Sequence, residues 1–137
     1  MSATAQTATT VTPARRRAIG VAGAVLACVL IWVIGAIAGV DYTVKNPGQP
    51  EMTIGIGPVV IVSLGAALVG WAALAVLERF LPRRATAVWI ALAVVLALLS
   101  LFPLTATEAT IGAKLTLGAM HLAVAAVLIS LLPSRHR

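Results

Sequence analysis

Charge is scarce in this chain of 137 residues. Asp, Glu, Lys and Arg make up only 10% of it, whereas hydrophobic residues make up 61%. A water-soluble domain carries about 25% charged and about 45–50% apolar residues. So little polar surface cannot cover a globule in water, which excludes a soluble enzyme and indicates that lipid surrounds most of the chain. For the same reason, the net charge of +6 does not indicate a nucleic-acid partner.

Residues that bind metals or form cross-links are equally scarce. The single cysteine, Cys28, excludes a disulfide scaffold, and the chain has only two histidines. There is no Gly-rich phosphate loop, no metal-ligand cluster and no nucleophile motif. We therefore predict no catalytic, cofactor-binding or metal-binding residue and no cofactor.

Long apolar runs are what the chain has instead. Crossing the hydrocarbon takes roughly 20 residues, with about 17–25 tolerated. Because lipid offers backbone amides no partner, each run must be helical or belong to a closed barrel, and the lack of polar alternation excludes the barrel. We predict an all-α polytopic membrane protein, a four-transmembrane-helix bundle between a disordered polar and basic tail at 1–17 and a basic tail at 133–137. The transmembrane domain is 18–132, with spans at about 18–40, 58–77, 85–104 and 115–132.

The basic residues predict the orientation of these spans. Eight of the ten Lys and Arg residues lie before the first span, between the second and third, or after the fourth. Only Lys45 and Lys114 fall in the other two loops. Because short loops rich in Lys and Arg stay in the cytoplasm, we expect both termini to be cytoplasmic.

The first span also has some features of a signal peptide. Three arginines at 15–17 precede an apolar run that ends near Ala36-Ile37-Ala38, a possible cleavage site. The apolar run of about 18 residues exceeds the roughly 7–15 of a signal peptide, which favours a retained span. The sequence leaves cleavage open.

Small residues are candidates for helix packing. Helices in lipid gain little from further apolar burial, so they associate where small residues allow close approach. Gly35 and Gly39 form a G-x-x-x-G pattern in the first span, and Gly70 lies in a stripe of small residues in the second. These positions favour packing within one bundle. The alternative is that a stripe binds a second copy of the chain or a larger membrane protein.

His121 is the main polar candidate at membrane depth. It lies six residues inside Leu115, about 9 Å from the boundary at 1.5 Å per residue. An ionisable group at this depth suggests a functional residue that faces the bundle or a wet cavity. The simpler hypothesis is a neutral imidazole that hydrogen-bonds Ser63 or Ser100 on another helix.

The carboxylates lie at the ends of the spans. Glu78 ends the second span, where we expect a charge cluster with Arg83 and Arg84 and attraction to anionic headgroups. Asp41 follows the first span, and we expect it to be a solvated loop charge.

Several strings resemble a known family when they are taken in order. They are Ala38–Val44, Gly70–Trp71, Leu77–Arg79, Ser100–Leu104 and Met120–Leu122. Over roughly 17–132, the chain resembles a family of uncharacterised four-span membrane proteins from high-GC Gram-positive bacteria. The resemblance implies a bacterial plasma membrane but transfers no activity. Asp41, Glu78 and His121 fall on its motif positions.

Three hypotheses of function follow. The first is a non-enzymatic accessory or structural component of the plasma membrane, with the bilayer, a second copy or a larger membrane protein as its partner. The second is a minimal oligomeric transporter or channel that uses His121. The third, a membrane-embedded redox or lipid-modifying enzyme, has the least support because it needs a cofactor or a nucleophile with a base.

Overall fold

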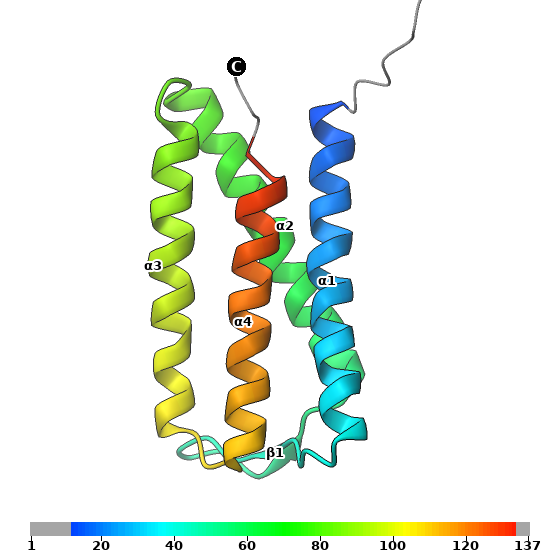
Figure 1. Ribbon diagram of the computed structural model, residues 1–137. Helices are drawn as coiled ribbons and strands as arrows, with labels where there is room; N and C mark the ends of the chain where they lie inside the picture. The colour runs from blue at the N-terminus through cyan, green and yellow to red at the C-terminus, as the bar shows by residue number, and fades with distance from the viewer. Residues whose placement is uncertain (1–11, 134–137) are drawn as a thin grey trace, which may run out of the picture.

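The described part of the chain forms four helices, each antiparallel to the next (Figure 1). The computed structural model describes residues 12–133, so the parts of the two predicted tails at 1–11 and 134–137 lie outside the described residues. All four helices are long and apolar enough to cross a membrane, which confirms the predicted architecture. Their bounds are α1 (Pro13–Ile37), α2 (Ile56–Phe80), α3 (Ala85–Ala106) and α4 (Ile111–Leu131).

The helices form a ring in which α1 packs on α2 and α4, and α3 packs on the same two helices. α2 runs obliquely behind the others in Figure 1, so that its C-terminal end lies by α3 and its N-terminal end by α1. Because the helices alternate in direction, their termini and connecting segments gather at two ends of the bundle. The arginine end holds the start of α1, the α2–α3 turn and the end of α4. The hairpin end holds the segment between α1 and α2 and the α3–α4 loop.

α1 begins earlier than the predicted span because Thr12 caps it. The Thr12 side chain accepts a hydrogen bond from the backbone N–H of Arg15 at 3.3 Å, and Pro13 occupies the first helical position. The three arginines at 15–17 are therefore helical. The prediction that the disordered tail extends to residue 17 is therefore wrong for residues 13–17, which belong to α1.

α1 also ends earlier than predicted, at Ile37 rather than Val40. Gly39 has a positive φ of 89°, the Gly39 N–H donates to the Ala36 carbonyl, and the Val40 N–H donates to the Gly35 carbonyl. This pair of bonds is a Schellman motif, in which a left-handed glycine closes a helix. No heavy atom lies within 4 Å of the place where a Gly39 Cβ would stand, so the prediction that Gly39 packs against a helix is wrong.

The other helices extend beyond their predicted spans. α2 starts two residues before Pro58, and α3 continues past Pro103 to Ala106. α4 starts at Ile111 rather than Leu115, because the Thr110 side chain accepts a hydrogen bond from the Ala113 N–H at 3.2 Å. Capping groups, and not the limits of the apolar runs, fix the starts of α1 and α4.

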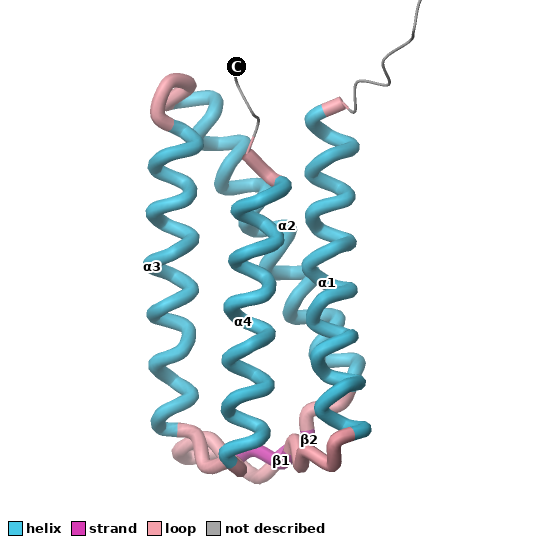
Figure 2. The backbone as a smooth tube through the Cα atoms, in the orientation of Figure 1, coloured by secondary structure: helices cyan, strands magenta, loops and turns pink. Residues whose placement is uncertain are grey.

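A short antiparallel hairpin lies across one end of the bundle (Figure 2). Its strands are β1 (Thr43–Val44) and β2 (Met52–Thr53), with Thr43 opposite Thr53. Lys45 and Glu108 then exchange two backbone hydrogen bonds of 2.9 Å, which joins the hairpin to the α3–α4 loop. The segment between the first two helices, which the sequence left without a structure, therefore closes the bundle.

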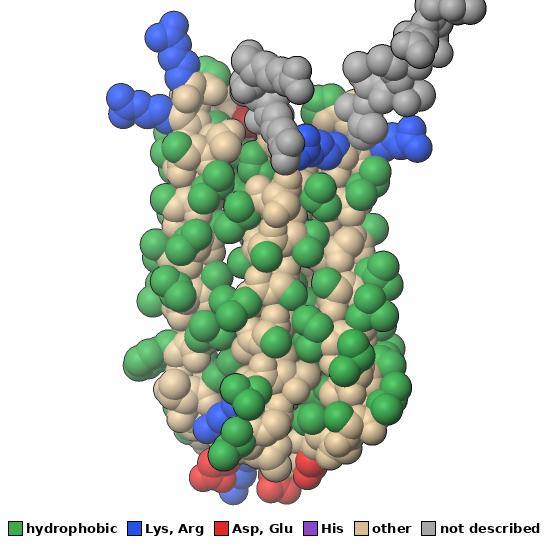
Figure 3. Space-filling view, in the orientation of Figure 1, with side chains coloured by type: hydrophobic (Ala, Val, Ile, Leu, Met, Phe, Trp, Pro, Cys, Tyr) green, Lys and Arg blue, Asp and Glu red, His purple; other side chains and the backbone are tan. Residues whose placement is uncertain are grey.

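The buried interior is apolar and small. One cluster lies toward the arginine end: Val21, Ala24, Ala67, Leu74, Trp89, Leu128 and Leu132. A second lies toward the hairpin end: Cys28, Tyr42, Val59 and Met120. Only Ala85 and Trp89 of α3 are buried, and most of its large apolar side chains face outward. Figure 3 shows this apolar belt between an end with arginines and an end with carboxylates.

Candidate functional site

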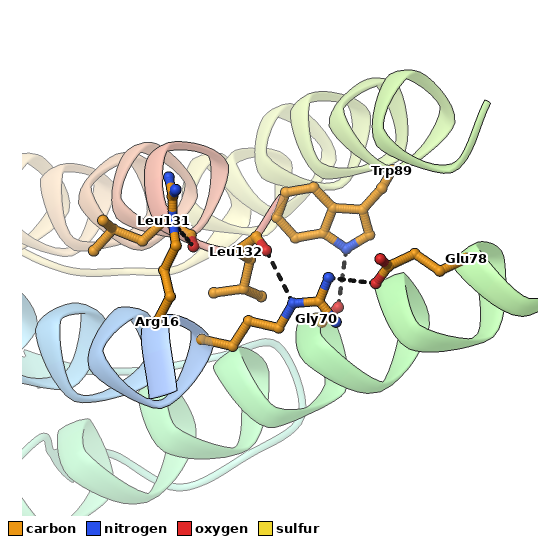
Figure 4. Close-up of polar contacts among 7 residues, drawn as sticks. Arg16, Gly70, Glu78, Trp89, Leu131 and Leu132 are labelled. Carbon is orange, nitrogen blue, oxygen red and sulfur yellow. Dashed lines mark hydrogen bonds and ion pairs between the residues drawn. The ribbon is translucent and has the colours of Figure 1, made fainter. Parts of the chain in front are cut away.

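An ion pair joins three helices at the arginine end. Arg17 on α1 is 8% exposed and forms an ion pair with Glu78 near the end of α2. Its Nε also donates to the Leu132 carbonyl, just past α4, at 3.0 Å. The dashed lines that end on Glu78 and Leu132 in Figure 4 mark these two contacts. Glu78 was expected to lie in a cluster with Arg83 and Arg84, but its partner in the structure is Arg17.

Arg16 binds the adjoining turn of α4. Its Nε donates to the Leu131 carbonyl at 3.0 Å (Figure 4). Its Nη2 donates to the Ser130 carbonyl, also at 3.0 Å. The last four carbonyls of a helix have no partner within it and carry partial negative charge. Two neighbouring arginines therefore supply donors to the end of α4.

The position of Arg17 could have been found in the sequence. Arg17, Val21, Ala24 and Cys28 follow one another at steps of four, three and four, and all four are buried. This spacing places them on one face of a helix. An arginine that continues an apolar stripe is expected to enter the bundle, and a carboxylate on a neighbouring helix is its natural partner.

Gly70 lies where α2 meets α3 and α4. The Trp89 indole N–H donates to the Gly70 carbonyl at 2.9 Å (Figure 4). A Cβ at Gly70 would lie 3.5 Å from Leu128 and 3.8 Å from Trp89, which is ordinary contact. Gly70 is therefore at a helix contact, as predicted, but the contact leaves room for a methyl group.

Gly35 accommodates a residue that sequence reasoning did not assign to the bundle. A Cβ at Gly35 would overlap the Tyr42 hydroxyl and lie 3.2 Å from Thr116. Tyr42, just before the hairpin, is 4% exposed and donates to the Trp32 carbonyl at 2.9 Å. Gly35 is a packing residue, as predicted, and it packs against Tyr42 of the hairpin segment as well as Thr116 of α4.

Trp32 completes the contact between this segment and the helices. Its ring stacks on Tyr42 with centroids 5.5 Å apart and an interplanar angle of 17°. Its indole N–H donates to the Ile54 carbonyl at 3.1 Å. Burial raises the pKa of the Tyr42 phenol, against a smaller opposing effect of a hydrogen bond with Thr116. The phenol O–H serves as the hydrogen-bond donor to the Trp32 carbonyl.

His121 bonds its own helix. Its Nδ1 lies 2.7 Å from the Leu117 carbonyl, and since a carbonyl can only accept, Nδ1 is the donor. The Ser63 hydroxyl donates to the Val59 carbonyl at 2.6 Å, and the Ser100 hydroxyl to the Ala97 carbonyl at 2.7 Å. The expected bond from His121 to Ser63 or Ser100 does not form, because each group takes a carbonyl one turn earlier in its own helix.

Asp41 is an exposed carboxylate that shapes the hairpin segment. It accepts a hydrogen bond from the Thr43 N–H at 3.0 Å. Hydrogen bonds from the Thr43 side chain and backbone hold the pKa of Asp41 below its ordinary value. Its own carbonyl accepts from the Thr110 hydroxyl at 3.3 Å. Asp41 thus links the end of α1 to the start of α4, and a solvated charge is only part of its role.

A shallow open pocket of about 260 Å³ lies beside the hairpin, lined by Lys45, Asn46, Pro47, Gly48, Ala106 and Glu108. The Thr107 hydroxyl donates to the Asn46 side-chain oxygen at 2.8 Å nearby. Within residues 12–133, no group of three or more His, Cys, Asp or Glu residues could hold a metal ion.

Comparison with known proteins identifies a family but no activity. Residues 8–137 match the model of a family described as a family of unknown function, DUF6069. No curated protein and no solved structure is detectably similar to the chain.

Proposed function

We propose that this chain, which belongs to the DUF6069 family of unknown function, is a non-enzymatic accessory or structural component of the plasma membrane. One observation carries the proposal: polar side chains at membrane depth bond carbonyls of their own helices. His121, Ser63 and Ser100 all do so. The space between the helices is filled by the two apolar clusters. Such an interior favours a packing role over a polar path.

A transport test separates this role from the alternative of a channel that uses His121. Purified protein in liposomes would be given a proton gradient across about pH 5–8, the range in which histidine titrates. We expect the same flux from the wild type, His121→Leu and empty liposomes, and no flux specific to the protein. Thr116→Val, which also removes a side-chain bond to a carbonyl of α4, serves as the matched control. Flux in the wild type that His121→Leu abolishes would overturn the structural role.

Stability provides a second readout for the same variants. The bond from His121 to Leu117 lies within one helix and links no second element. Polar contacts in membranes average about 0.6 kcal/mol. We expect His121→Leu to change the free energy of unfolding in detergent by less than about 1 kcal/mol and to retain full helix content. A larger loss would show that His121 holds the bundle together.

We further propose that the arginine end faces the cytoplasm of a bacterium, with both termini inside. The positive-inside rule supports this orientation, since Arg83 and Arg84 lie in the α2–α3 turn and three more arginines lie at 15–17, whereas the hairpin end holds two lysines, Lys45 and Lys114. In a Cys28→Ala background, a membrane-impermeant thiol reagent applied to intact cells should label Glu51→Cys and spare Arg83→Cys. The reverse pattern would overturn the orientation.

A further inference from the structure

Two groups of arginines at the arginine end differ in their contacts. In the first group, the side chains of Arg16 and Arg17 donate to carbonyls at the end of α4, and Arg17 also pairs with Glu78. The other group comprises Arg79 at the end of α2 and Arg83 and Arg84 in the following turn, and all three are exposed. Within the described residues, 12–133, their side chains form no hydrogen bond or ion pair.

No carboxylate is left to neutralise this second group. The chain has four acidic residues. Asp41, Glu51 and Glu108 lie at the hairpin end, and Glu78 is already paired with Arg17. Figure 3 shows Lys and Arg side chains projecting from the α2–α3 turn, away from the rest of the bundle. Three guanidinium groups are therefore presented within six residues and remain available to an external anion.

The same turn exposes large apolar side chains. Phe80 is 73% exposed and Leu81 is 45% exposed, and both lie between Arg79 and Arg83 in the chain. Exposed apolar side chains of this size are stable in acyl chains and unfavourable in water. Their presence places the turn at the boundary where acyl chains meet headgroups, so the arginines stand at headgroup level.

From this juxtaposition we propose that the α2–α3 turn binds the phosphate of an anionic phospholipid through Arg79, Arg83 and Arg84, while Phe80 and Leu81 contact its acyl chains. Guanidinium groups bind phosphate oxygens through paired, charge-assisted hydrogen bonds. Clusters of basic residues beside a transmembrane helix attract anionic lipids. An acidic soluble protein would satisfy the arginines but would leave the two apolar side chains without a partner, which favours the lipid.

Native mass spectrometry of the full chain tests the proposal. The protein would be released from micelles doped with equal amounts of phosphatidylglycerol and phosphatidylcholine. We expect the wild type to retain phosphatidylglycerol in preference. Arg83→Gln with Arg84→Gln should reduce that retention by more than about tenfold, since each basic residue near an anionic surface is worth about a fivefold change in affinity. Lys45→Gln with Lys114→Gln removes the same charge at the opposite end and should keep the preference.

Three outcomes would overturn the proposal. They are equal retention of the two lipids by the wild type, an unchanged preference in the doubly substituted arginine variant, and complete displacement of the lipid by millimolar inorganic phosphate. The last would show that the turn binds free phosphate and not a lipid. Helix content and thermal unfolding in detergent should not differ between the two double variants, so a loss of lipid would not reflect a loss of fold.

Discussion

The two ends of the bundle close it by different means. At the arginine end, side chains do so: Arg16 and Arg17 bind the last carbonyls of α4, and Glu78 pairs with Arg17. At the hairpin end, the backbone closes the bundle through β1, β2 and the reciprocal bonds of Lys45 and Glu108. Both solutions satisfy polar groups that lipid cannot satisfy. Closure at the arginine end depends on a few charged side chains, whereas closure at the hairpin end is distributed over several backbone hydrogen bonds.

Loss of the central guanidinium should have the largest effect. Arg17→Met leaves the Glu78 carboxylate, whose side chain is 34% exposed, without its partner. Removing one member of a buried ion pair costs about 3–5 kcal/mol, and the partial exposure of Glu78 favours the lower value of about 3 kcal/mol. Unfolding in mixed detergent micelles, followed by circular dichroism, measures the change.

Two further variants test the cause. Arg17→Met with Glu78→Leu should recover most of the lost stability, because an apolar pair can replace a buried ion pair. Arg15→Gln, which changes an exposed arginine two residues away, should have little effect. Equal destabilisation by Arg15→Gln and Arg17→Met would mean that net charge, and not this contact, stabilises the arginine end.

An added methyl group at Gly35 should damage the hairpin end. In Gly35→Ala the new Cβ would overlap the Tyr42 hydroxyl, so the tyrosine must leave its place against α1. Overpacking of this kind costs about 1–3 kcal/mol. Gly70→Ala is the matched control, since its Cβ would make only ordinary contacts and alanine favours a helix.

Fluorescence and unfolding measurements distinguish the two glycine variants. Gly35→Ala should lower stability by about 2 kcal/mol and change the emission of Trp32, which stacks on Tyr42. Tyr42→Phe should restore part of the loss in the Gly35→Ala background because it removes the overlapping hydroxyl. A Gly70→Ala variant that is as unstable as Gly35→Ala would contradict this account.

Acid should loosen the hairpin end slightly. The folded pKa of Asp41 lies below its ordinary value of 3.8, so the carboxylate contributes stability above that value and loses it as the pH falls through the folded pKa. Hydrogen exchange at the Thr43 amide should become less protected below about pH 4 in the wild type. Asp41→Asn should show no such change, and an identical acid response in the two proteins would exclude Asp41 as its source.

The sequence predicted the four helices correctly because a single physical effect, the transfer of apolar side chains from water to lipid, dominates there. Four uninterrupted apolar runs have no stable place except lipid, so the four helices followed from hydropathy alone. The hairpin could not be found in the same way, since strands of two residues carry no periodic signal. Its position depends on contacts between distant segments, such as Lys45 with Glu108.

Errors at single residues have equally physical causes. The G-x-x-x-G pattern assumes that one helix contains both glycines, whereas Gly39 ends α1. The predicted bond between His121 and Ser63 or Ser100 assumed that polar side chains in lipid pair across helices. In the structure, His121 and Ser63 instead bond a backbone carbonyl one turn earlier in their own helix. Arg17 was assigned to the tail because charge was taken to mark the limit of the helix. Its place on the buried stripe of α1 shows otherwise.

The hydrogen bonds from Arg16 and Arg17 to the end of α4 have a consequence for biosynthesis. These arginines bind carbonyls 114 and 115 residues farther along the chain, so their partners leave the ribosome after the first three helices. Arg17 can pair with Glu78 once α2 has been made, but α1 must remain in the bilayer without its contacts to α4 until α4 has been synthesised. A nascent chain stalled before Ser130 would contain three complete helices and most of α4, yet Arg16 and Arg17 could not bind the end of α4.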